Sequence, residues 1–117
     1  MSYVELWARA FLLTLGTELA LGVPLLGRES PRLRRFGAVV AGNAVSHPVL
    51  WFVIARAVQP YGLVLLVGEA WAVLFETLLY RLLVPRVGWS RAFLVSLLAN
   101  AASVGVGLLA RDLGVRV

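Results

Sequence analysis

Four long apolar stretches dictate how this chain can fold. Each runs for about 20 residues, the length a helix needs to cross about 30 Å of hydrocarbon. They span residues 6–26, 36–58, 62–84 and 92–110. The connections are too short for a separate soluble domain, and 61% of the 117 residues are hydrophobic, more than soluble domains contain. The sequence therefore predicts an all-α integral membrane protein, with four transmembrane helices in a single domain over residues 1–117.

Arginines indicate which side of the membrane each connection faces. The chain has 11 basic residues, and all of them are arginine. Seven lie in or beside the connections after the first and third apolar stretches, and four lie at the opposite side. The positive-inside rule places the first group in the cytoplasm and both termini outside, an N-out/C-out arrangement. We therefore expect a multi-pass protein in the cytoplasmic membrane of a bacterium or archaeon, with the lipid bilayer as its main partner.

Composition and motifs leave several classes of protein without support. The net charge of +5 comes from arginines at helix ends, so it reports topology and gives no indication of nucleic-acid binding. There is no cysteine, which excludes disulfides and thiolate metal sites. HExxH, Gly-x-Ser-x-Gly and glycine-rich phosphate motifs are absent. We expect the first apolar stretch to be a permanent helix and no signal peptide, because no basic region precedes it and Glu18 interrupts it.

A glutamate followed by an Asn-Ala-x-Ser motif occurs once in each half of the chain. The two sets are Glu18 with Asn43-Ala44-Val45-Ser46, and Glu76 with Asn100-Ala101-Ala102-Ser103. One residue deleted in the arginine-rich connection brings the halves into register as two helical hairpins, about 5–58 and 62–112. Because a hairpin returns the chain to the side where it started, the repeats would be parallel. Their pseudo-twofold axis would lie along the membrane normal.

The polar side chains of the four predicted helices lie at two matching depths. The first layer is about 7–9 residues, or roughly 10–14 Å, from the cytoplasmic helix ends. It consists of Glu18, Asn43, Glu76 and Asn100. The second layer lies about one turn further out and contains His47, Glu69, Ser46, Ser103 and Thr14. Matching depths are what a buried site requires, so the sequence predicts a polar centre inside the membrane.

The glutamates of this centre must be neutralised. A charged residue at the centre of a transmembrane helix costs about 2.5–3.5 kcal/mol, and no arginine lies deep enough to compensate. The carboxyls are therefore either protonated or balanced by a bound cation. The oxygens of Glu18, Glu76, Asn43 and Asn100 suit Na⁺ or a divalent cation, whereas Glu18 and Glu76 with His47 and Glu69 suit a transition metal. A divalent cation is thus a candidate cofactor, and a proton is the alternative.

Three functions are compatible with such a centre. The one we favour is a small transport protein coupled to a cation or proton, which would form a homodimer or higher oligomer because four helices enclose little space. The second is an accessory subunit whose polar faces pair with a partner membrane subunit. The third, an intramembrane enzyme acting on lipid, is favoured least because no nucleophile or metal motif is present. Asparagine and serine also join membrane helices by hydrogen bonds, and His47 can be a packing residue.

Overall fold

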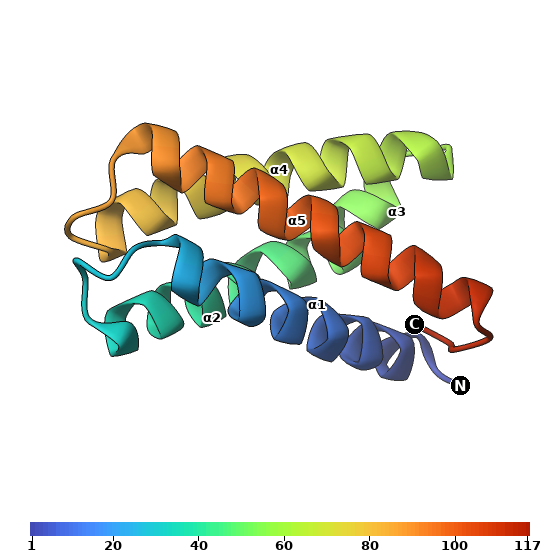
Figure 1. Cartoon of the computed structure of the whole chain (residues 1–117). Helices are drawn as coiled ribbons and strands as arrows, with labels where there is room; N and C mark the ends of the chain where they lie inside the picture. The colour runs from blue at the N-terminus through green and yellow to red at the C-terminus, as the bar shows by residue number, and fades with distance from the viewer.

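The computed structural model describes all 117 residues as a bundle of long helices (Figure 1). The elements are α1 (Tyr3–Leu25), α2 (Arg32–Val49), the π-helix η1 (Leu50–Ile54), α3 (Ala55–Ala57), α4 (Tyr61–Leu83) and α5 (Trp89–Asp112). The elements α2, η1 and α3 form one continuous helix, Arg32–Ala57. Four helices are therefore long and apolar enough to cross a membrane, which confirms the predicted all-α membrane architecture. Each begins one to four residues before the apolar stretch that predicts it.

Local signals fix the ends of these helices. Ser2 caps α1 in a reciprocal pair, in which the Glu5 amide donates to Ser2 Oγ at 3.1 Å and the Ser2 amide donates to Glu5 Oε2 at 2.6 Å. Gly27, at φ 100°, takes the left-handed conformation just after α1, as glycine often does beyond a helix C-terminus. Prolines stand directly before α2 and α4, where a missing amide hydrogen is no loss.

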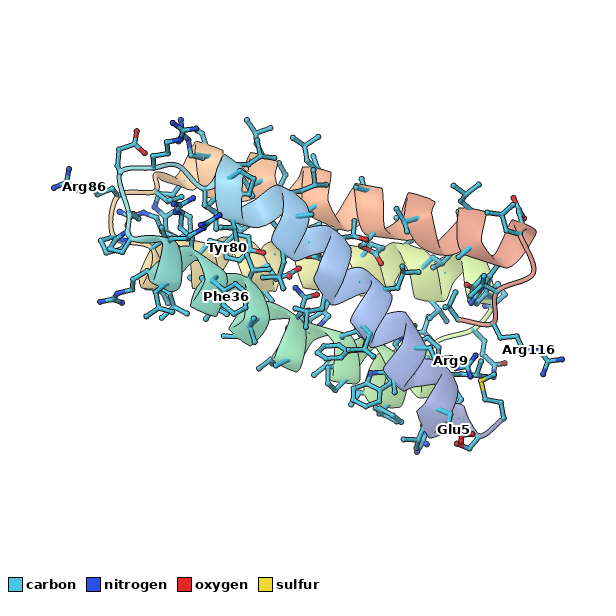
Figure 2. All side chains as sticks on the ribbon, turned by 60° about the horizontal axis from the view of Figure 1, so that its bottom comes forward. Glu5, Arg9, Phe36, Tyr80, Arg86 and Arg116 are labelled. Carbon is cyan, nitrogen blue, oxygen red and sulfur yellow. The ribbon has the colours of Figure 1, made fainter.

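The four long helices pack as a closed ring. In order around the bundle, α1 packs on α2, α2 on α4, α4 on α5, and α5 back on α1. The chain termini and the turn before α4 lie at one end, here named the terminal end (Figure 1). The connections after α1 and α4 lie at the other, here named the arginine end. Figure 2 shows Arg86 at the arginine end, and Arg9 and Arg116 at the terminal end.

The arginine end is filled by an apolar core. Its buried members come from α2, α4 and α5 and from both connections: Leu26, Ala38, Val39, Tyr80, Val84, Val87, Ala92 and Val95. We name this set the apolar plug. Beside it, the Arg35 side chain donates to the carbonyls of Ser30 and Val23, so its buried guanidinium joins the first connection to α1. The bundle is therefore closed at this end.

The outer surface of the bundle is apolar, as lipid contact requires. Leucines on α1 and α4 are exposed by about two thirds: Leu12, Leu66, Leu74 and Leu82. Such an extensive exposed apolar surface is not expected of a protein in water. The polar residues of the two predicted layers face inward, and the leucines face outward.

Pro48 precedes the only irregular part of the long helices. The sequence predicts that Pro48 kinks its helix and frees a carbonyl near Ala44. In the structure α2 continues through Pro48, and the wider turns of η1 follow at once. The Leu50 side chain in η1 packs against Gly68 of α4, where a Cβ would lie 2.8 Å from Leu50 Cδ1. Helix α5 is α-helical throughout and has no such feature.

Candidate functional site

Two carboxyl groups meet at the centre of the bundle. Glu18 comes from α1 and Glu76 from α4, which lie across the ring from each other. Both side chains are 0% exposed, and the two carboxyls are immediate neighbours. The structure thus brings together the two glutamates that the sequence places at one depth.

The two asparagines flank this carboxyl pair. Asn100 Nδ2 donates to Glu76 Oε2 at 2.7 Å and to the Ser96 carbonyl at 2.8 Å. Asn43 lies beside Glu18, and its Nδ2 donates to the Val39 carbonyl at 3.0 Å. Each amide is therefore held by a carbonyl four residues earlier in its own helix. Only Asn100 also donates to a glutamate.

Three of the four oxygens of the carboxyl pair have no hydrogen-bond partner. They are both oxygens of Glu18 and Oε1 of Glu76. An ionised carboxylate can only accept hydrogen bonds, whereas a protonated one can also donate. Two adjacent buried carboxylates without a basic partner repel each other and are poorly solvated. This arrangement is suited to holding a proton or a small cation between the two groups.

Gly42 provides the room for Glu76. A Cβ at Gly42 would lie 3.0 Å from Glu76 Cγ and 3.4 Å from its Oε1. Any larger residue on this face of α2 would press on the carboxyl. The sequence analysis missed this role, although Gly42 directly precedes Asn43.

A cavity of about 550 Å³ leads from the carboxyl pair towards the terminal end. All four long helices line it. Glu18, Asn43 and Asn100 lie at its inner end, next to the apolar plug, and Tyr3 and Tyr61 lie near its mouth. The cavity therefore opens at the terminal end, while the arginine end is filled.

The predicted second layer lines the same cavity. Glu69, His47, Ser46, Ser103 and Thr14 all contribute to its walls. His47 packs against the rings of Phe11 and Trp51, with centroids 5.5 and 6.0 Å away, and its Nδ1 has no hydrogen-bond partner. The sole ion pair of the chain joins Arg91 to Glu29 at 3.8 Å, so no arginine pairs with a membrane glutamate.

The residues considered for a transition metal do not converge as one group. No set of three or more histidine, aspartate or glutamate side chains lies close enough together to hold a metal ion. Glu18 and Glu76 are adjacent, whereas His47 and Glu69 lie on the cavity walls. Metal binding by these four residues stays a prediction.

Helices α2 and α5 bury the same pattern of positions. The buried residues of α2 are Arg35, Ala38, Val39, Gly42, Asn43 and Ser46, and those of α5 are Ala92, Val95, Ser96, Ala99, Asn100 and Ser103. Each residue of the first set is 57 positions before its equivalent in the second. The cavity lining repeats this spacing: Asn43, Ser46, His47, Leu50 and Trp51 match Asn100, Ser103, Val104, Gly107 and Leu108. The two helices thus turn equivalent faces to the centre.

Sequence reasoning missed the aromatic residues near the cavity mouth. From the sequence alone, we expect Tyr3 and Tyr61 to belong to the aromatic belt at the membrane surface. We expect Trp51 to pack against other residues or to face lipid. All three line the cavity. A signal for the tyrosines was present, because Tyr3 and Tyr61 are separated by 58 residues, the separation of Glu18 and Glu76.

Comparison with known proteins adds no family to this description. The chain matches no protein-family model, no curated protein and no solved structure.

Proposed function

We propose that this chain is a small membrane transport protein in which the Glu18–Glu76 pair exchanges a proton or cation with its substrate. The observation that carries the proposal is a fully buried carboxyl pair at the inner end of a cavity that opens at one end of the bundle. A carboxyl without a basic partner inside a membrane protein is a candidate functional group by default. Its position beside a cavity gives an ion a route to it.

A proton is the coupling ion that the geometry supports best. Two neighbouring carboxyls can share one proton, which gives one of them a donor and removes the repulsion of two charges. The Asn100 amide fixes Glu76 as an acceptor, so Glu18 is the freer group to take up and release the proton. A monovalent cation coordinated by the same oxygens is the alternative coupling ion.

Transport also requires access from the other side of the membrane. The apolar plug lies between the carboxyl pair and the arginine end. We propose that this end is cytoplasmic, following the positive-inside rule, and that the cavity faces outward. A second conformation would open the plug and close the cavity mouth.

Two parallel hairpin repeats, about 5–58 and 62–112, provide a basis for such a change. The matching faces of α2 and α5 support the repeat, with a pseudo-twofold axis along the membrane normal. Rocking one hairpin against the other around the carboxyl pair would alternate access. We propose that the chain works as a homodimer or higher oligomer, because its apolar outer faces are free to pair with another copy.

The polar faces favour transport over an accessory-subunit role. A subunit whose polar faces serve a partner should direct them outward. Here Glu18, Glu76 and Asn100 meet inside one chain, and leucines cover the outside.

Proton movement in proteoliposomes containing a pH-sensitive dye tests the proposal. Gradients of Na⁺, K⁺ and small organic cations, and a membrane potential, are applied in turn. The wild-type chain should couple at least one of them to proton movement. Glu76→Gln removes the carboxyl that shares the proton with Glu18, and it should lower the rate by about 100-fold, the lower range for a positioned proton-transfer group. Glu29→Gln, a change of an exposed acid at the arginine end, is the control and should keep the wild-type rate. Equal rates for Glu76→Gln and wild type would rule out a role of the carboxyl pair in coupling.

A further inference from the structure

The cavity has the size and surface of a site for a small organic molecule. Its volume of about 550 Å³ lies within the roughly 300–1,000 Å³ of typical ligand pockets. Of its 26 lining residues, 15 are hydrophobic. A hydrated inorganic ion would leave most of this surface unused, whereas an organic molecule with an apolar body would cover it.

The charges that line the cavity favour a positively charged guest. Glu69 on the wall makes no hydrogen bond or ion pair, and Glu18 lies deeper with both oxygens unpartnered. The one arginine of the lining, Arg111, is already engaged near the mouth. Its Nη1 donates to Tyr61 Oη at 3.0 Å and its Nε donates to the Val117 carbonyl at 3.3 Å. Arg111 thus keeps its positive charge near the mouth, whereas the acidic side chains Glu69 and Glu18 lie deeper in the cavity.

Aromatic side chains line another part of the same cavity. Tyr3, His47 and Trp51 come from α1, α2 and η1, whereas Glu69 comes from α4. The Tyr3 hydroxyl donates to the Trp51 carbonyl at 2.6 Å, and the two rings lie 5.3 Å apart. Aromatic faces attract organic cations, and the Arg56 guanidinium already lies 6.0 Å from the Tyr3 ring centre.

The two halves of the chain differ at the positions that make one wall of the cavity acidic and another aromatic. Glu69 matches Phe11, His47 matches Val104, and Trp51 matches Leu108. Between the carboxyl pair and the mouth, an acid thus occurs only on the α4 wall, and the aromatic pair His47 and Trp51 only on the wall of α2 and η1. These walls are neighbours, because α2 and η1 pack on α4, so a cation beside both would contact a carboxylate and aromatic rings.

We propose that this cavity binds a hydrophobic organic cation, such as a protonated amine or a quaternary ammonium compound. Glu69 is its first anionic contact, and Glu18 lies deeper along the same path. This proposal gives the substrate class of the proposed transport function, and it rests on that function for the coupling to protons. Binding of the cation can be measured without transport. Equilibrium binding in detergent, with empty micelles subtracted, is the experiment.

Two probes of equal shape separate the contribution of charge to the binding affinity from that of shape. Benzyltrimethylammonium carries a permanent positive charge, and neopentylbenzene is its uncharged carbon isostere. The cation should bind at least about tenfold more tightly, because a desolvated carboxylate and aromatic faces add to the apolar contact. Equal affinities would overturn the proposal and indicate an apolar guest, such as a lipid tail. Displacement of the bound cation by millimolar Na⁺ would also overturn it and indicate an inorganic-ion site.

Variants locate the binding site. Glu69→Gln should weaken benzyltrimethylammonium about tenfold and leave neopentylbenzene unchanged. Glu69→Asp keeps the charge and should retain most of the affinity. Asp112 is an exposed acid at the terminal end that does not line the cavity. Asp112→Asn is therefore the control and should bind benzyltrimethylammonium as the wild type does. Unchanged affinity in a folded Glu69→Gln protein would contradict the assignment. If Glu69→Gln does not fold, the affinities of the wild-type protein for the two probes still test whether the cavity prefers a cation.

Failure of this proposal is distinguishable from failure of the transport function. Selective binding of the cation without any proton movement in proteoliposomes would support the site and contradict coupled transport. Proton movement driven by Na⁺ or K⁺, without selective binding of the organic cation, would support transport and contradict the substrate class.

Discussion

Asn100 and Asn43 occupy equivalent positions, yet only one of them bonds to a glutamate. Asn100 joins α5 to Glu76 of α4, whereas Asn43 bonds only to its own helix. The depth of both residues could be counted from the sequence, because a helix rises by a constant 1.5 Å per residue. Which amide would meet a carboxyl could not be predicted, because it depends on helix rotations and on the space that Gly42 leaves.

Replacing each asparagine by alanine should expose this difference. Asn100→Ala leaves Glu76 without its donor, and an unsatisfied buried acceptor costs about 1–3 kcal/mol. Asn43→Ala removes the same atoms but no bond to a glutamate, so its loss should be smaller. Denaturant unfolding of the purified variants measures both changes. Equal losses would show that the bond between Asn100 and Glu76 contributes nothing to stability.

Among the helices, α2 and α4 approach each other closely at Gly42, where a Cβ would lie 3.0 Å from Glu76 Cγ. The apolar stretches predicted the four long helices to within a few residues, since hydropathy records lipid contact directly. The sequence did not predict η1, whose wider turns accompany Leu50 packing on Gly68. It also did not predict the end at which the cavity opens, because that follows from how all four helices pack together.

Two glycines of α2 provide a matched test of this contact. A Cβ at Gly42 would press on Glu76 at 3.0 Å, whereas one at Gly37 would meet nothing within 4 Å. Gly42→Ala should therefore displace the carboxyl and lower both stability and transport. Gly37→Ala should raise stability by about 0.5–1 kcal/mol, because alanine is the better helix former. Thermal unfolding distinguishes them, and a Gly42→Ala protein as stable as Gly37→Ala would contradict the packing described here.

The whole molecule presents one open end and one filled end. The distribution of arginines predicted that the two ends differ, and the structure gives this difference a physical form: a cavity at the terminal end and the apolar plug at the arginine end. Their assignment to the two sides of the membrane rests on the positive-inside rule.

The orientation can be tested with single cysteines, because the chain has none of its own. Val115→Cys is exposed at the terminal end and Ser90→Cys at the arginine end, and neither substitution changes a charge. In intact cells a membrane-impermeant maleimide should label position 115, and label position 90 only after the membrane is opened. The reverse pattern would invert the topology, and labelling of both in intact cells would indicate that copies insert in both directions.

The unequal walls of the cavity have a consequence for how such a protein could arise. In a symmetric pair of identical hairpins, every residue appears on both walls, so an acid at one position faces the same acid across the axis. A single chain that carries both hairpins is free of that constraint. Under the proposed repeat, it can keep matched asparagines and serines at the centre, while the position of Glu69 differs from that of Phe11 and the position of Trp51 from that of Leu108. Fusion of two hairpins into one gene would thus allow what a symmetric ancestor could not: a cavity whose walls differ in chemistry.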